Sequence, residues 1–131
     1  MVDYKIGNSR QTKYCKALVE SLTKMGHATN LELLQDLRQL YPNLSATTVH
    51  RATARLASRN QIGIAPANKR GSTRYDINSS QHDHFLCQAC DRLVDIDIKD
   101  QLQPLLEQSL KGFSLSSRLT IAGRCHSCQL T

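Results

Sequence analysis

Two C-x-x-C pairs in the second half of the chain restrict its fold more than any other feature. Cys87 and Cys90 form the first pair, Cys125 and Cys128 form the second, and 34 residues separate them. Four thiolates from two such pairs make the usual closed, tetrahedral zinc site. A single pair is also compatible with redox chemistry, and two unrelated thiol pairs are the remaining alternative. We expect one structural zinc, bound with on the order of 10 kcal/mol of folding free energy.

The length of the chain, 131 residues, predicts one or two small domains. A second domain of that size needs a metal or a partner subunit for stability. The sequence has no apolar run near the roughly 18–20 residues that span a bilayer. The first ten residues, MVDYKIGNSR, lack the apolar region of a secretory signal. We therefore expect a cytoplasmic protein with reduced thiols, whose cysteines are metal ligands or buried.

The net charge of +6 is confined to the first half of the chain. Residues 1–77 hold 12 Lys and Arg against 5 Asp and Glu, whereas residues 78–131 hold 5 against 6. A basic half of this kind indicates a polyanionic partner such as nucleic acid. An acidic protein surface is the less favoured alternative.

Three amphipathic helices are predicted in the basic half, over residues 11–25, 29–42 and 43–60, because apolar residues recur there every three or four positions. The expected helix caps are Thr29 or Asn30 and Ser45, and the expected stop is Pro42. The expected inward-facing residues are Cys15, Leu18, Leu22, Met25, Leu33, Leu34, Leu37, Leu40, Ala46, Val49, Ala52 or Thr53, and Leu56. Cys15 is therefore read as a core residue and not as a reactive thiol.

The helical spacing of apolar residues ends after Asn60. Residues 61–77 predict a β-hairpin with a basic turn. Three short helices followed by such a hairpin have the order of a winged helix-turn-helix, whose third helix enters the DNA major groove. A solvated arginine face is the alternative for the third helix. The residues expected on the DNA-binding surface are Thr47, Thr48, His50, Arg51, Arg55 and Arg59 on the helix, and Lys69, Arg70 and Arg74 on the hairpin.

The segment between the cysteine pairs predicts a small α/β unit. Residues 91–98 alternate like a strand, residues 99–111 are helical and broken or begun at Pro104, and residues 112–123 are strand-like. An edge strand is then available for pairing with a second copy of the chain.

Two histidines just before the first cysteine pair are the second candidate metal feature. In a strand, His82 and His84 point to one face and Asp83 to the other. Two imidazoles on one face favour a second metal site, although ordinary surface histidines show the same spacing. His126 lies inside the second cysteine pair and is expected to be exposed and not a ligand.

These motifs together resemble the ferric uptake regulator (Fur) family from about residue 10 to 128. The similarity rests on RYDI, HDHFLCQACDRLVDI, CHSCQ and SATTVHRATARL. The resemblance implies an α+β chain, with a winged-helix DNA-binding domain over 1–78 and an α/β dimerisation domain with a four-cysteine zinc over 79–131. It also implies a homodimeric repressor that binds double-stranded operator DNA.

The family further implies a regulatory Fe(II) or Mn(II) bound between the two domains, for which imidazole and carboxylate ligands are suited. The residues carried over as its ligands are His27, Asp76, His82, His84 and Asp95. An Asp at position 95 resembles the peroxide-sensing (PerR) branch, whereas iron-sensing members commonly have Glu there. The oxidation-sensitive ligands of that branch correspond to His27 and His82. Gln81 and Ser116–Ser117 stand where members with a further metal site have histidines, so that site is expected to be absent.

Three alternatives to a peroxide-sensing repressor remain. An iron- or zinc-responsive regulator of the same family shares all the motifs above. A zinc hydrolase using H-x-H is disfavoured because five protein ligands leave little open coordination and no nucleophile or general base lies nearby in the sequence. A zinc-ribbon RNA-binding module does not account for the hairpin or the second ligand set. We therefore expect a regulator and not an enzyme.

Overall fold

The computed structural model describes residues 9–129, with side chains from residue 13 onward. The chain divides into two compact units, one ending at Ser80 and the other beginning at Gln81. The elements in order are α1 (Ser9–Met25), β1 (His27–Thr29), α2 (Asn30–Leu37), α3 (Ala46–Ser58), β2 (Gly63–Ala65), β3 (Arg74–Asp76), β4 (Asp83–Cys87), β5 (Leu93–Ile96), α4 (Lys99–Leu110), β6 (Thr120–Gly123) and α5 (His126–Gln129). None of the helices within 9–129 is long and apolar enough to cross a membrane.

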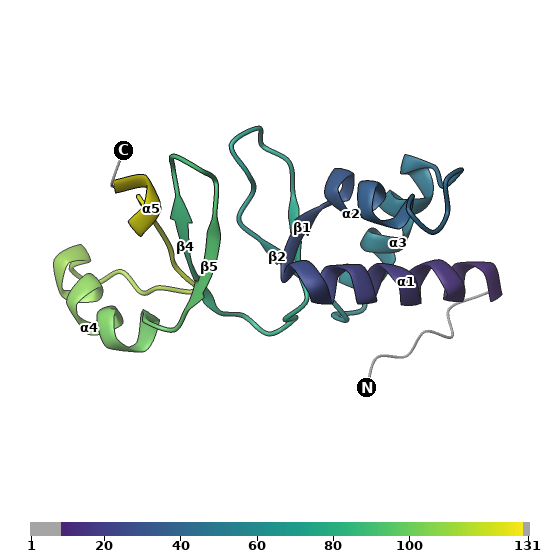
Figure 1. The fold of residues 1–131 in the computed structure, drawn as a ribbon. Coiled ribbons are helices and arrows are strands. Elements are labelled where there is room, and N and C mark those ends of the chain that lie inside the picture. Colours follow the sequence, from purple (N-terminus) through teal and green to yellow (C-terminus); the bar gives the residue numbers. More distant parts are fainter. Residues whose placement is uncertain (1–8, 130–131) are drawn as a thin grey trace. The chain divides into compact units, whose positions relative to one another are not determined.

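The core of the first unit lies between α1, α2 and α3, which pack together in Figure 1. Leu18, Leu22, Leu33 and Leu56 are buried almost completely. α2 begins at a capping box, in which the Thr29 hydroxyl accepts from the Glu32 amide and the Glu32 carboxylate accepts from the Thr29 amide. The Ser45 hydroxyl caps α3 by accepting from the backbone amide of residue 48.

Three residues expected in this core are exposed instead, and each lies at a helix end. Met25 is the last residue of α1, directly before Gly26, whose φ of 78° turns the chain. α2 ends at Leu37, well before Pro42, so Leu40 lies in a turn and is 71% exposed. Ala46 is the first residue of α3 and faces solvent. Helical periodicity alone does not predict burial here, because Met25 and Ala46 lie in terminal helix positions and Leu40 lies beyond the end of α2.

A three-stranded antiparallel sheet completes the first unit, in the order β1-β3-β2. The hairpin of β2 and β3 is closed by the Asn68 carboxamide, which accepts from the backbone amides of Arg70 and Ser72. Lys69 and Arg70 are exposed at this turn. Arg74 was expected on the same basic surface, but it lies within β3 and is only 6% exposed.

The second unit is built on the sheet β5-β4-β6. β4 is its central strand, antiparallel to β5 and parallel to β6. Pro104 lies inside α4 and does not break it, and only residues 120–123 of the strand-like segment 112–123 form a strand. α4 and the turn after it leave Leu105, Leu110 and Phe113 exposed.

Candidate functional site

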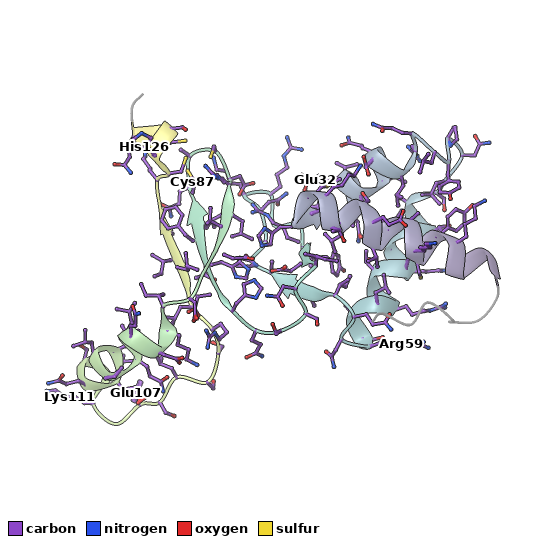
Figure 2. All side chains as sticks on the ribbon, turned by 60° about the horizontal axis from the view of Figure 1, so that its bottom comes forward. Glu32, Arg59, Cys87, Glu107, Lys111 and His126 are labelled. Carbon is purple, nitrogen blue, oxygen red and sulfur yellow. The ribbon has the colours of Figure 1, made fainter. Side chains whose placement is uncertain are left out.

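The four cysteines of the second unit form one cluster. Their sulfur atoms all lie within 4.8 Å of one another, and Cys90 Sγ lies 3.7 Å from Cys125 Sγ. Four sulfurs at 2.3 Å around a tetrahedral zinc are about 3.8 Å apart, so this spacing fits the ion. Figure 2 labels Cys87 at the end of β4, beside the short helix α5. The β4–β6 pairing and the first turn of α5 therefore position the cluster.

The backbone around the cluster favours thiolates. The amides of Cys125 and Cys90 each donate to Cys87 Sγ at 3.4 Å, and they lower the pKa of Cys87 to about 5. A backbone hydrogen bond from Cys128 lowers the pKa of Cys125 in the same way. The hydrogen bond between Cys128 and the Cys125 sulfur raises the pKa of Cys128 to about 12, because neighbouring sulfurs already hold the negative charge. A divalent cation relieves this repulsion, so the cluster is suited to a metal.

His126 lies between the two cysteines of the second pair, on α5. Its side chain is exposed. The backbone amide of Cys128 donates a hydrogen bond to the backbone carbonyl of Cys125. The exposure of His126 is as expected from the sequence.

One imidazole–carboxylate pair lies in the sheet of the first unit. His27 on β1 is the register partner of Asp76 on β3, and His27 Nε2 lies 3.3 Å from Asp76 Oδ2. Asp76 is 2% exposed, and its other oxygen accepts from the backbone amide of Asn78 at 2.9 Å. Strand pairing thus places one ring nitrogen and one carboxylate oxygen, both suited to ligate a metal ion, next to each other.

A second such group lies in the sheet of the second unit. His84 on β4 is the register partner of Asp95 on β5, with His84 Nε2 3.4 Å from Asp95 Oδ1. His82 Nε2 lies 3.1 Å from the same oxygen, and the two imidazole rings are 4.3 Å apart. The two histidines therefore lie on one face, as the H-x-H spacing predicts, and both approach the carboxylate of Asp95.

Asp83 points away from these histidines into the second unit. Its carboxylate is fully buried and accepts from the backbone amides of Ile98, Lys99 and Leu119, at 2.7–2.9 Å. Burial opposes ionisation, but these hydrogen bonds and the nearby Arg118 guanidinium lower the pKa of Asp83 to about 2. Asp83 thus joins the start of α4 and the approach to β6 to the central strand, a role the sequence did not indicate.

The candidate DNA-binding face of the first unit is the outer side of α3. Thr47, His50, Arg51 and Arg59 are exposed, and Figure 2 labels Arg59 at the end of the helix. Thr48 and Arg55 are half-buried. Lys69 and Arg70 are exposed on the hairpin turn. Sequence reasoning missed Asn30, whose side chain contacts His50 from α2.

Comparison with known proteins finds several that are similar in sequence or in fold. The model of the "Ferric uptake regulator family" matches residues 3–121. A peroxide-responsive repressor, PerR, of Staphylococcus aureus (strain USA300) is 32% identical over 108 residues, which cover 79% of this chain and 70% of that protein. The ferric uptake regulator of Helicobacter pylori, described as having three functional metal binding sites, superposes with a TM-score of 0.75 at 23% identity over 95% of this chain and 83% of that one. The Campylobacter jejuni peroxide stress regulator superposes with a TM-score of 0.67 at 22% identity, over 89% and 90% of the two chains.

Proposed function

Because this chain belongs to the ferric uptake regulator family, we propose that it is a metal-dependent transcriptional repressor that binds operator DNA as a homodimer and senses peroxide. Family members are metal-responsive regulators and not enzymes. The observation that carries the peroxide-sensing assignment is the group on β4 and β5, where the short side chain of Asp95 faces both His82 and His84.

The four-cysteine cluster is assigned to structural zinc. Soft thiolates prefer zinc over harder cations, and four sulfurs complete its tetrahedral coordination. A closed site leaves no position for a substrate or water, so its role is to hold β4, the turn after it and α5 together.

The imidazole–carboxylate groups of the two units are assigned to one shared regulatory ion. Three ring nitrogens and two carboxylates from His27, Asp76, His82, His84 and Asp95 suit Fe(II) or Mn(II). Only five residues separate Asp76 from His82 in the sequence, so the connection between the two groups is short. An ion shared in this way favours the arrangement that brings the units together, and its higher affinity for that arrangement shifts the population towards it.

Two of these histidines are suited to react with peroxide. The side chains of His27 and His82 are 15% and 14% exposed, against 7% for His84, so a small oxidant reaches the first two more easily. Fe(II), when bound, would supply the one-electron reduction of peroxide beside these rings, which Mn(II) does not readily supply; overall, the ring would take one oxygen atom from peroxide and water would leave. Oxidation of a ligand ring weakens its bond to the ion and thereby the DNA-binding arrangement.

The dimer is assigned to the second unit. Leu105, Leu110 and Phe113 on α4 and its C-terminal turn are exposed apolar side chains, and β5 and β6 are the edges of the sheet. Burial of such residues against a second copy gains about 25 cal/mol per Å² of apolar surface. A two-fold dimer then presents two α3 helices to successive major grooves, about 34 Å apart.

The salt dependence of DNA binding tests the role of α3. If Arg51 contacts a phosphate, Arg51→Ala should make the slope of log K against log salt shallower by about 0.9, because one fewer counterion is released. Fluorescence anisotropy of Mn(II)-loaded protein on an operator duplex, over a series of KCl concentrations, measures this slope. Arg92→Ala removes the same charge from an exposed position in the second unit and should leave the slope nearer the wild-type value. Equal slopes for both variants would place Arg51 outside the interface.

The sensing proposal is tested by operator binding of Fe(II)- and Mn(II)-loaded protein, each with and without peroxide. Fe(II)-loaded protein is expected to release DNA at low peroxide and to gain one oxygen atom on the peptide carrying His27 or His82, measured by mass spectrometry. Mn(II)-loaded protein is expected to stay bound. Asp95→Glu is the matched variant, because it keeps the carboxylate and should weaken the peroxide response while retaining metal-dependent binding.

Two other results would contradict this proposal. Fe(II)-loaded protein that resists peroxide and responds only to metal removal would indicate an iron- or zinc-responsive regulator. Oxidation confined to Cys87 or Cys90, with loss of zinc, would place the sensor in the cysteine cluster.

A further inference from the structure

The Asn30 side chain connects two elements of the first unit through hydrogen bonds. Asn30 is the first residue of α2, and its Nδ2 lies 3.1 Å from Nδ1 of His50 on α3. Its Oδ1 accepts from the hydroxyl of Thr53, one turn further along α3, at 2.9 Å. Thr53 is fully buried, whereas His50 is exposed. A buried hydroxyl thus holds one end of the amide, and the other end contacts an exposed imidazole.

Apart from the contact with Asn30, one side of the His50 ring faces open space. A hollow of about 300 Å³ opens beside His50 and Asn30. Its other lining residues are Thr29, Leu31, Ser72, Thr73 and Tyr75. An imidazole beside such a hollow has room to rotate, because no close-packed neighbours fill that side. The hydrogen bond from Asn30 therefore favours one orientation of the ring.

The direction of the hydrogen bond determines which ring nitrogen of His50 carries the proton. A carboxamide nitrogen only donates, so Nδ1 of His50 must accept. A neutral imidazole that accepts at Nδ1 has its proton on Nε2 and presents a donor there. In the major groove, guanine O6 and N7, adenine N7 and thymine O4 are acceptors, whereas cytosine presents only a donor.

We propose that Asn30 is a positioning residue for sequence recognition, which holds His50 with Nε2–H directed outward to read a base that carries a major-groove acceptor. This inference rests on the proposed function, because it requires the outer face of α3 to meet DNA. It goes beyond that function by assigning a specificity role to a residue of α2 that acts through α3.

Removal of the Asn30 side chain leaves the local fold supported. The cap of α2 is Thr29, so Asn30→Ala retains the capping box. The hydroxyl of Thr53 also lies 3.2 Å from the carbonyl of Val49 and 3.1 Å from that of His50, and it donates to one of these when Asn30 is absent. The variant therefore tests orientation of the ring, and a thermal melt followed by circular dichroism checks that folding is retained.

The experiment measures base discrimination. Mn(II)-loaded wild type selects a duplex from a library with a randomised centre, and that duplex is then substituted one base pair at a time. His50→Ala identifies the base pair that His50 reads, as the position whose discrimination ratio falls. Asn30→Ala should lower the ratio at the same position about fivefold, in keeping with one lost base contact. Gln35→Ala, which removes a carboxamide from an exposed position on the same helix, should leave the ratio unchanged.

The double variant separates positioning from a general structural effect. In the His50→Ala background, Asn30→Ala should produce no further loss of discrimination, because the two residues act as a unit. The inference is overturned if Asn30→Ala weakens all duplexes equally or if it leaves discrimination intact. If the wild type selects no duplex at all, the proposed function itself fails, and the inference fails with it.

Discussion

Cys125→Ser protein is expected to lose its zinc and the ordered fold of the second unit together. A structural zinc site contributes on the order of 10 kcal/mol to folding, and a serine hydroxyl is a poor replacement for a thiolate. Among residues 81–129, which the structure describes, Cys87 is the only apolar residue that is buried. The second unit therefore has almost no hydrophobic core to compensate for the lost ion.

Zinc per chain by elemental analysis, size-exclusion chromatography and far-ultraviolet circular dichroism measure this effect. The variant should contain no bound zinc, elute as a non-native species and retain helical signal from the first unit. His126→Ala is the matched control, because His126 lies between two of the cysteines and is exposed; it should retain zinc and native size. A Cys125→Ser protein with one zinc per chain and native elution would falsify the structural role.

Periodicity predicted the interiors of the helices and failed at their ends. Cys15, Leu22, Leu37 and Val49 are buried as expected, because their spacing follows the helical repeat within each segment. The errors at Leu40 and elsewhere arise where a turn or a cap ends the repeat. Helix ends depend on hydrogen bonds to particular neighbours, which a window of apolar residues does not reveal.

The candidate sites differ in how many of their residues lie close together in the sequence. The cysteine cluster follows from two short motifs, since each C-x-x-C brings its own sulfurs together. The strand alternation of His82 and His84 was also local, but Asp95 was suggested by resemblance alone and reaches them through β-strand register. Asn30 could not be assigned to His50, because their contact joins residues of two different helices that lie 20 positions apart in the chain.

Asp83 is the clearest case of a residue whose role depends on distant partners. The alternation of strand β4 predicted only that its side chain points away from the histidines. Its three backbone donors belong to Ile98, Lys99 and Leu119, residues 15 to 36 positions away. A buried carboxylate with three amide donors and a guanidinium is fully satisfied, and its removal leaves the three amides without this acceptor, whereas Arg118 keeps its contact with Asp97.

Asp83→Ala is therefore expected to destabilise the second unit by about 3 kcal/mol, the lower end of the range for breaking a buried charged network. Hydrogen exchange of the zinc-loaded protein measures this locally, because the amides of Ile98, Lys99 and Leu119 should exchange about 100-fold faster. Asp97→Ala is the matched control. Its carboxylate also pairs with Arg118, at 3.3 Å, but its side chain is 85% exposed, and an exposed pair contributes little. Because Asp97→Ala removes one carboxylate from the same arginine without touching the three amides, it should leave their protection intact. Equal protection of these amides in both variants would contradict the prediction, because it would show that their hydrogen bonds to Asp83 contribute little to the stability of the second unit.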